Sequence, residues 1–154
     1  MLLVPASVLW DGGSAQTDPL LNQALGSPGT GALFGGGAIV VTTAAKHALH
    51  IRTGALAVDL ESAAVARAAI RHALPFAVLR AVCDPAARAL PHAALVAVDA
   101  RGRIGMLRVA GAVLARPWEM PALLRLAWDA AGARRALLAR VASIAPLHWP
   151  PWTP

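Results

Sequence analysis

The chain has 154 residues, of which 57% are hydrophobic and 14% are charged. This length suits one domain with a real core, and the apolar composition excludes an intrinsically disordered chain. The net charge is +6, and the excess lies in residues 101–154, where eight arginines face only Glu119 and Asp129. A basic C-terminal part can meet a phosphate-rich partner or an anionic membrane, although a solvated helix face is the more common use of such charge.

The sequence has no stretch that is long and apolar enough for a transmembrane helix, and Met1–Pro5 lacks the basic residues of a signal peptide. Cys83 is the single cysteine, which leaves no intrachain disulfide and fits a reducing compartment. We therefore expect a cytoplasmic protein, peripheral to the inner membrane if the basic part binds lipid. The expected organisation is one domain over residues 1–145 and a Pro/Trp-rich tail over residues 146–154.

The first elements are predicted from apolar runs and turn residues. Leu2–Trp10 is apolar and predicts a strand, and Asp11–Ser14 is a turn signal. A short helix is predicted over residues 20–25, because Thr17 or Asp18 can cap it and a proline follows at its first position.

Three consecutive glycines, Gly35–Gly37, precede a β-branched run that predicts a strand over residues 38–41. Glycines at such a place allow either a turn or a close approach of the backbone to a phosphate. The lysine–serine pair of a phosphate-binding loop is missing, so a turn before the strand is the favoured interpretation.

A helix is predicted from Thr42 or Thr43 to about Ile51, with a threonine as its cap. His47 and His50 share one face of this helix, three residues apart, which is a spacing found in metal sites. No carboxylate or cysteine is close in sequence, and we therefore expect no metal here.

The central stretch reads as strand, helix, strand. Residues 55–58 are apolar, residues 63–70 have helical periodicity, and residues 76–83 form a second apolar run after a proline. Two parallel strands joined by a helix would bring Glu61 and Asp84 to one sheet edge, where ligands of open α/β sheets bind.

The C-terminal part is predicted to be mainly helical. Residues 95–98 fit a strand or a helical turn, residues 99–103 a turn, and residues 105–115 a helix that ends at Arg116-Pro117. The longest helical pattern, residues 118–143, mixes leucines with arginines. Such a helix can lie on a membrane, but packing on a sheet is the favoured interpretation.

Two carboxyl groups in one pocket suit the cleavage of a purine nucleoside. Burial favours protonation of one of them, which can then protonate the purine as leaving group, while an ionised partner accepts hydrogen bonds from the ribose diol. The alternative is structural: Glu61 stabilises the first turn of a helix, and Asp84 precedes Pro85 in a loop. Spacing alone favours this structural alternative.

Residues 58–64 (VDLESAA) and 74–84 (LPFAVLRAVCD) resemble the signature of the purine nucleoside phosphorylase and nucleosidase superfamily. In that family, V-[DE]-M-E-[SG]-A-A is followed by a helix and by P-F-x-x-[IVL]-R-x-[IV]-[SC]-D. The resemblance continues through Lys46 and residues 53–55. Downstream, residues 84–91 and the arginine-rich last helix are most similar to the hopanoid-associated phosphorylase branch. The resemblance implies a three-layer α/β fold with a mixed central sheet flanked by helices.

The resemblance also implies roles for individual residues. Glu61 would bind the ribose hydroxyls, Leu60 would pack on the sugar, and Asp84 would be the acid at the purine. Cys83 would be a small hydrogen-bonding or packing residue, and Arg80 would order the strand end or a carboxylate.

The implied activity is release of adenine from an adenosylated hopanoid. A methylthioadenosine or adenosylhomocysteine nucleosidase is one alternative, and a non-catalytic protein that binds a membrane or partner is another. No cofactor is expected, and inorganic phosphate is a candidate co-substrate. Expected partners are the adenosyl nucleoside with its hopanoid lipid, a membrane surface and a second copy of the chain, but no nucleic acid.

One departure from the family pattern concerns the start of the chain. Family members begin with a strand and a glycine-rich loop that supply the phosphate site or the water-activating glutamate. Met1 here begins an apolar strand that corresponds to the middle of that fold. We therefore expect an N-terminally incomplete version of the fold.

Overall fold

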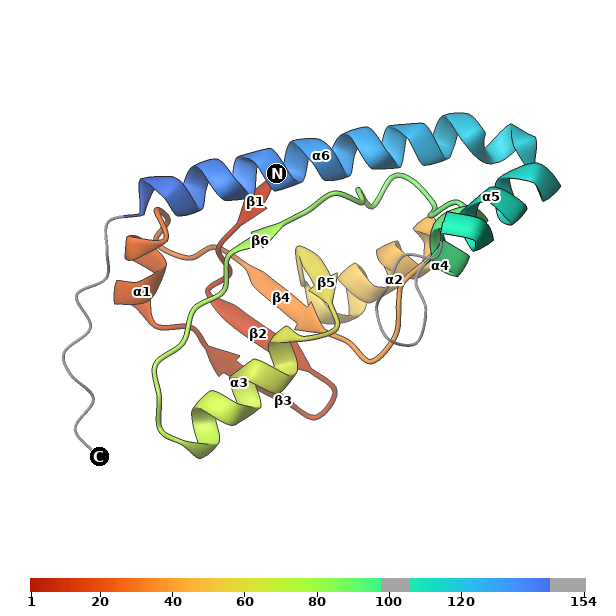
Figure 1. Ribbon diagram of the computed structural model, residues 1–154. Helices are drawn as coiled ribbons and strands as arrows, with labels where there is room; N and C mark the ends of the chain where they lie inside the picture. Colours follow the sequence, from red (N-terminus) through yellow and green to blue (C-terminus); the bar gives the residue numbers. More distant parts are fainter. Residues whose placement is uncertain (98–105, 145–154) are drawn as a thin grey trace.

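The computed structural model describes residues 1–97 and 106–144, which form a mixed sheet with helices on both sides (Figure 1). The strands are β1 Leu2–Leu3, β2 Ser7–Trp10, β3 Gly13–Gln16, β4 Ala32–Gly35, β5 Ala57–Asp59 and β6 Arg80–Ala81. The helices are α1 Pro19–Ala24, α2 Thr43–Thr53, α3 Ser62–Arg71, α4 His92–Ala97, α5 Met106–Ala115 and α6 Met120–Ser143, with a 3-10 turn at Pro117–Glu119. The predicted α/β class is confirmed.

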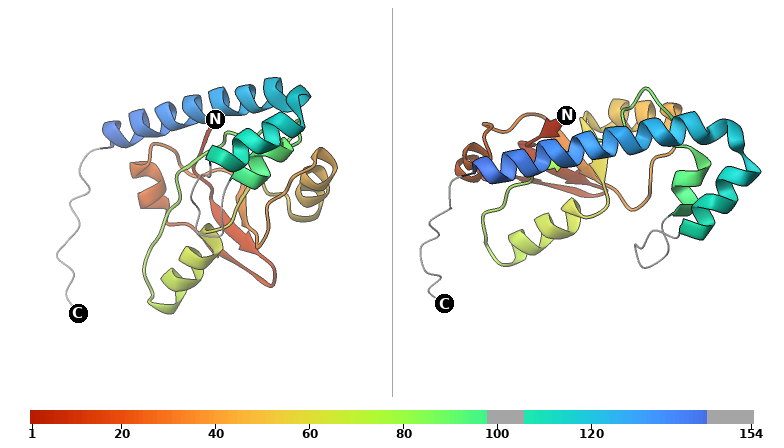
Figure 2. Two further views of the ribbon diagram at one scale, coloured as in Figure 1. Left: turned by 45° about the vertical axis from the view of Figure 1, so that its right-hand side comes forward. Right: turned by 45° about the horizontal axis from the view of Figure 1, so that its top comes forward.

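The main sheet has the strand order β3-β2-β4-β5, and β1 and β6 form a separate antiparallel pair. Strands β2, β4 and β5 are parallel, whereas β3 forms a hairpin with β2. Helix α3 packs against one face of the main sheet, and α6 packs on the β1–β6 pair on the other side (Figures 1 and 2). The core between the sheet and α3 consists of Val8, Ala15, Ala66, Trp10, Phe76 and Val78.

The predicted first strand is two strands, because the chain is interrupted around Pro5. Proline has no N–H for a strand ladder, and the Pro5 carbonyl accepts a 2.7 Å hydrogen bond from the Thr17 hydroxyl instead. The predicted turn at residues 11–14 is shorter than expected, since β3 already begins at Gly13. Asp11-Gly12 forms the hairpin turn. Gly12 has a φ of 87°, and Asp-Gly is a common hairpin turn because glycine readily takes a positive φ.

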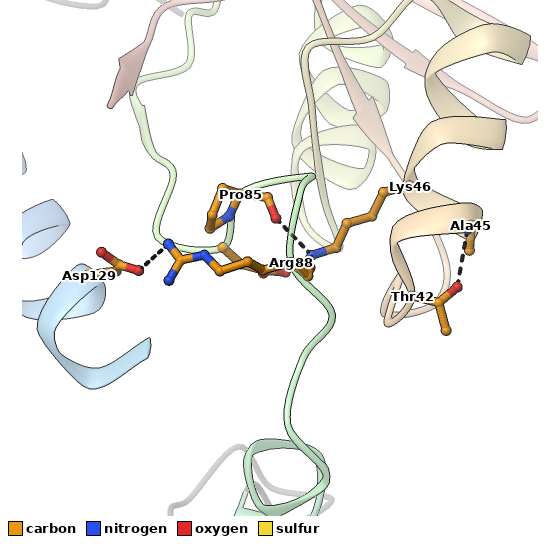
Figure 3. Close-up of polar contacts among 7 residues, drawn as sticks. Thr42, Ala45, Lys46, Pro85, Arg88 and Asp129 are labelled. Carbon is orange, nitrogen blue, oxygen red and sulfur yellow. Dashed lines mark hydrogen bonds and ion pairs between the residues drawn. The ribbon is translucent and has the colours of Figure 1, made fainter. Parts of the chain in front are cut away.

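Both predicted helix caps are confirmed. The Asp18 carboxylate accepts a 2.9 Å hydrogen bond from the Leu21 amide at the start of α1. The Thr42 hydroxyl accepts a 3.1 Å bond from the Ala45 amide at the start of α2 (Figure 3). These caps fix where the two helices begin, and α2 is the helix that carries Lys46.

The prediction for the three glycines is wrong in its order. Strand β4 ends at Gly35, the first of the three glycines, whereas residues 38–41 form no strand. Residues 32–35 occupy the place between β2 and β5, and residues 38–41 lie in the connection from β4 to α2. Gly35 makes a close approach, but to α3 rather than to a ligand: a Cβ there would lie 2.6 Å from the Ala63 nitrogen and would overlap the Ala63 Cβ.

This close approach predicts a strong effect of a single methyl group. We expect Gly35→Ala to lower the free energy of unfolding by about 2–3 kcal/mol, because the new methyl group forces β4 and α3 apart. Gly37→Ala is the matched control, since a Cβ at Gly37 meets nothing within 4 Å, and it should change stability by less than about 0.5 kcal/mol. Urea unfolding measures both values, and equal stabilities of the two variants would contradict this account of β4.

The predicted strand over residues 76–83 is also wrong in its pairing. Only Arg80–Ala81 is a strand, and it runs antiparallel to Leu2–Leu3 instead of parallel to β5. The preceding residues are held differently: the Phe76 carbonyl accepts a 2.8 Å bond from the Asp18 amide, and Phe76 packs on the core. Glu61 and Asp84 therefore do not meet at the edge of one parallel sheet.

The C-terminal helices agree with the sequence. Residues 95–97 belong to α4, the predicted helix at 105–115 is α5, and α6 packs on the β1–β6 strand pair, as the favoured interpretation required. Within the described residues, none of the helices is both long and apolar enough to cross a bilayer. The predicted turn at 99–103 and the tail at 146–154 lie outside the described residues, and the single domain over 1–145 stays a prediction.

Candidate active site

A cavity of about 770 Å³ lies between α2, β5, the segment after β6 and α6. This volume is within the usual range for small-molecule sites. Apolar residues form much of its wall, among them Val40, Leu49, Leu56, Val58, Val82 and Trp128. The charged residues Lys46, Arg80, Asp84, Arg88 and Asp129 also line it. The cavity thus joins an apolar wall to a group of charged side chains.

Lys46 and Asp84 form the most enclosed ion pair of this group. The Lys46 ammonium lies 2.7 Å from each carboxylate oxygen of Asp84, and the two side chains are 9% and 26% exposed. The same ammonium is 2.7 Å from the Arg88 carbonyl oxygen and 3.2 Å from that of Pro85 (Figure 3). Because an ammonium has three hydrogens, these four acceptors saturate it. Lys46 therefore fixes both the carboxylate and the loop that follows it.

A second ion pair connects the same loop to α6. The Arg88 guanidinium donates to the Asp129 carboxylate at 2.5 Å (Figure 3). The neighbours Trp128, Gly132 and Ala133 form the α6 wall of the cavity. The two ion pairs therefore connect α2, the loop after Asp84 and α6 around the cavity.

A network around Asp59 orders the start of α3. The Asp59 side chain is fully buried, and its Oδ1 accepts bonds from the Ser62 amide at 3.0 Å and the Glu61 amide at 3.3 Å. Its Oδ2 accepts from the Ser62 hydroxyl at 2.5 Å. Arg80 lies 3.5 Å from Asp59 and 3.2 Å from the Glu61 carboxylate. Of the two roles expected of Arg80, at the strand end or at a carboxylate, these contacts fit the second.

The structure separates the four site residues that the sequence suggested. Asp84 and Cys83 line the cavity, whereas Glu61 and Leu60 are not among its lining residues. The Glu61 side chain is 72% exposed and reaches the cavity wall only through its ion pair with Arg80. Leu60 is exposed on the neighbouring surface. The roles assigned to these four residues stay predictions.

Sequence reasoning missed the partner of Asp84 and the importance of Asp59. Lys46 lies 38 residues before Asp84, and no local pattern connects them. A signal for Asp59 was present, because an aspartate three residues before Ser62 can accept a bond from the first amides of a helix. Of the two histidines considered as metal ligands, His50 instead makes a 2.9 Å hydrogen bond with the Ala55 carbonyl. Among the residues that the structure describes, no cluster of three potential ligands could hold a metal.

Comparison with protein families connects part of the chain to a known family. The family model described as the phosphorylase superfamily matches residues 20–115. The matched region includes Lys46, Arg80, Asp84 and Arg88, whereas Asp129, which also lines the cavity, lies outside it. Searches of the curated proteins and of the solved structures found no match.

Proposed function

This chain belongs to the phosphorylase superfamily, and from that premise we propose that it cleaves the N-glycosidic bond of a purine nucleoside in the cavity beside Asp84. Membership supports nucleoside-cleaving activity in general. The observation that carries the more specific proposal is the Lys46–Asp84 ion pair, which lies in the wall of a mostly apolar cavity within the matched region.

The proposed chemistry uses the ion pair as the source of one proton. A purine is a poor leaving group as an anion, so a proton must reach its N7 as the bond between C1′ and N9 breaks. The proton passes from the Lys46 ammonium to Asp84 and from Asp84 to N7, while the electron pair of the broken bond goes to the purine. Solvent then returns a proton to the pair. A positioned acid of this kind accelerates bond cleavage by about 10²–10⁴-fold.

The sugar carbon needs an oxygen nucleophile to complete the reaction. Attack by inorganic phosphate at C1′ gives a sugar 1-phosphate, whereas attack by water gives the free sugar and releases a proton. We assign Glu61 to the ribose hydroxyls, because its ion pair links it to Arg80, which lines the cavity, and an ionised carboxylate accepts from a diol. Leu60 is exposed beside Glu61 and does not line the cavity, so it would contact the sugar only where the sugar extends beyond the wall, and Cys83 would shape the wall itself.

The proposed substrate is an adenosyl nucleoside with a large apolar 5′ group, specifically an adenosylated hopanoid. The apolar wall formed by Leu49, Leu56 and Val58 supports this choice, since it can take up apolar surface from water. The volume of about 770 Å³ leaves room for more than a nucleoside.

Chromatography of the released base tests the proposal. The purified chain is incubated with adenosylhopane, methylthioadenosine and adenosylhomocysteine, each with and without inorganic phosphate. We expect adenine release to be fastest from adenosylhopane, and the sugar product identifies phosphate or water as the nucleophile. Faster release from one of the smaller nucleosides would overturn the hopanoid assignment alone. No release from any of them would overturn the proposed function.

A further inference from the structure

The outer face of α6 carries a line of exposed apolar side chains. The line consists of Met120, Leu124, Trp128 and Leu138, all of which are exposed. The spacing of these residues places them on one face of the helix. Trp128 is 73% exposed despite its size. The opposite face, with the buried Ala133, packs on the protein. Figure 2 shows α6 lying across the surface of the molecule.

The exposed charges on α6 have one sign. Arg125, Arg134 and Arg135 are exposed, and the ion pairs that the structure describes do not include them. Arg135 lies within the apolar line, because it follows Trp128 by seven residues and precedes Leu138 by three.

The two acidic residues near this face are already engaged. Asp129 is bound to Arg88, and Glu119 accepts from Arg116 at 3.2 Å and from the Ala93 amide at 3.4 Å. Desolvation raises the pKa of Glu119, but the hydrogen bonds from Arg116 and the backbone outweigh it and lower the pKa below the usual value. Glu119 therefore stays ionised and paired at neutral pH and offers no free acid to the arginines.

We propose that the outer face of α6 binds an anionic membrane surface, with the helix lying in the plane of the headgroups. Leucine, methionine and tryptophan side chains on this face would enter the acyl boundary, where tryptophan is favoured. The arginine side chains are long enough to reach the lipid phosphates at the same depth.

The charge of the face favours lipid over a second copy of the chain. A two-fold interface would bring two copies of the same arginine-bearing face together, and the neighbouring carboxylates are already paired. Anionic lipid supplies the missing counter-charge over the whole face. This proposal does not depend on catalysis, although Trp128 also lines the cavity and would place its opening beside the lipid.

Vesicle sedimentation with the full chain tests the proposal. Vesicles of phosphatidylcholine with phosphatidylglycerol are compared with pure phosphatidylcholine, at low and at high salt. We expect at least about tenfold stronger binding to the anionic vesicles and a loss of most of this difference at high salt. Equal binding to the two vesicle types, or no binding to either, would overturn the proposal.

Matched variants localise the binding to α6. Arg135→Glu should weaken binding to the anionic vesicles about tenfold. Arg71→Glu is the matched control, because it makes the same charge change at an exposed position of α3, on the other side of the sheet (Figure 1). It should weaken binding less than about threefold. The double variant Leu124→Ser, Leu138→Ser should likewise weaken binding, and Ile51→Ser on α2 should not.

Equal effects of Arg135→Glu and Arg71→Glu would show attraction by net charge alone. A dimer of the wild type that Leu124→Ser dissociates, without vesicle binding, would assign the face to a second copy instead.

Discussion

Asp84→Asn is expected to lower the rate of adenine release at least about 100-fold, because an amide cannot carry the proton to the leaving purine. The amide has nearly the size of the carboxylate and still offers one oxygen to Lys46, so the cavity should keep its shape. The measurement is kcat/KM for the best substrate, from chromatography of adenine.

Asp11→Asn is the matched control for this change. Asp11 is exposed, pairs with Arg52 at 3.3 Å and is not among the residues that line the cavity. Its variant should have the wild-type rate. Circular dichroism checks that both variants are folded. If folded Asp84→Asn released adenine as fast as the wild type, the acid would lie elsewhere.

Lys46→Met is expected to lower the free energy of unfolding by about 3 kcal/mol. The change leaves the Asp84 carboxylate partly enclosed without its counter-charge, and it also removes the donor to the carbonyls of Pro85 and Arg88. Urea unfolding measures the loss. Combining Lys46→Met with Asp84→Asn should cost less than the sum of the single changes, because the double variant no longer holds an unpaired carboxylate.

The exposed pair of Arg52 and Asp11 provides the comparison for Lys46. Both of its side chains are mostly in solvent, so Arg52→Met should change the stability by less than about 1 kcal/mol. If Lys46→Met had an equally small effect, the Lys46–Asp84 pair would not hold the loop as the structure indicates.

The elements that the sequence predicted correctly are those determined by neighbouring residues. Asp18 and Thr42 cap helices through amides three residues away, and α3 and α6 show their periodicity within their own length. The strand errors have the opposite origin. Whether residues 76–83 pair with β5 or with β1 depends on where Leu2–Leu3 lies, and no pattern within the segment contains that information.

The candidate site divides in the same way. The motif with Cys83 and Asp84 pointed to residues that do line the cavity, and its arginine was rightly expected near a carboxylate. Glu61 was expected beside Asp84 because residues 76–83 were predicted to pair in parallel with β5. This pairing is not formed, and Glu61 lies at the surface. Lys46 could not be connected with Asp84 before the fold was known, since α2 and the loop meet only in three dimensions.

We propose that the glycosidic bond is cleaved inside the cavity beside Asp84. Ala86 and Ala87 are adjacent and both exposed, but only Ala86 lines this cavity. The most direct measurement is therefore adenine release by the wild type, Ala86→Trp and Ala87→Trp on the same substrate. We predict that the wild type and Ala87→Trp are similarly active and that Ala86→Trp, whose indole would occupy part of the cavity beside Asp84, is at least about tenfold slower. Full activity of Ala86→Trp, or no release by the wild type, would contradict cleavage inside this cavity.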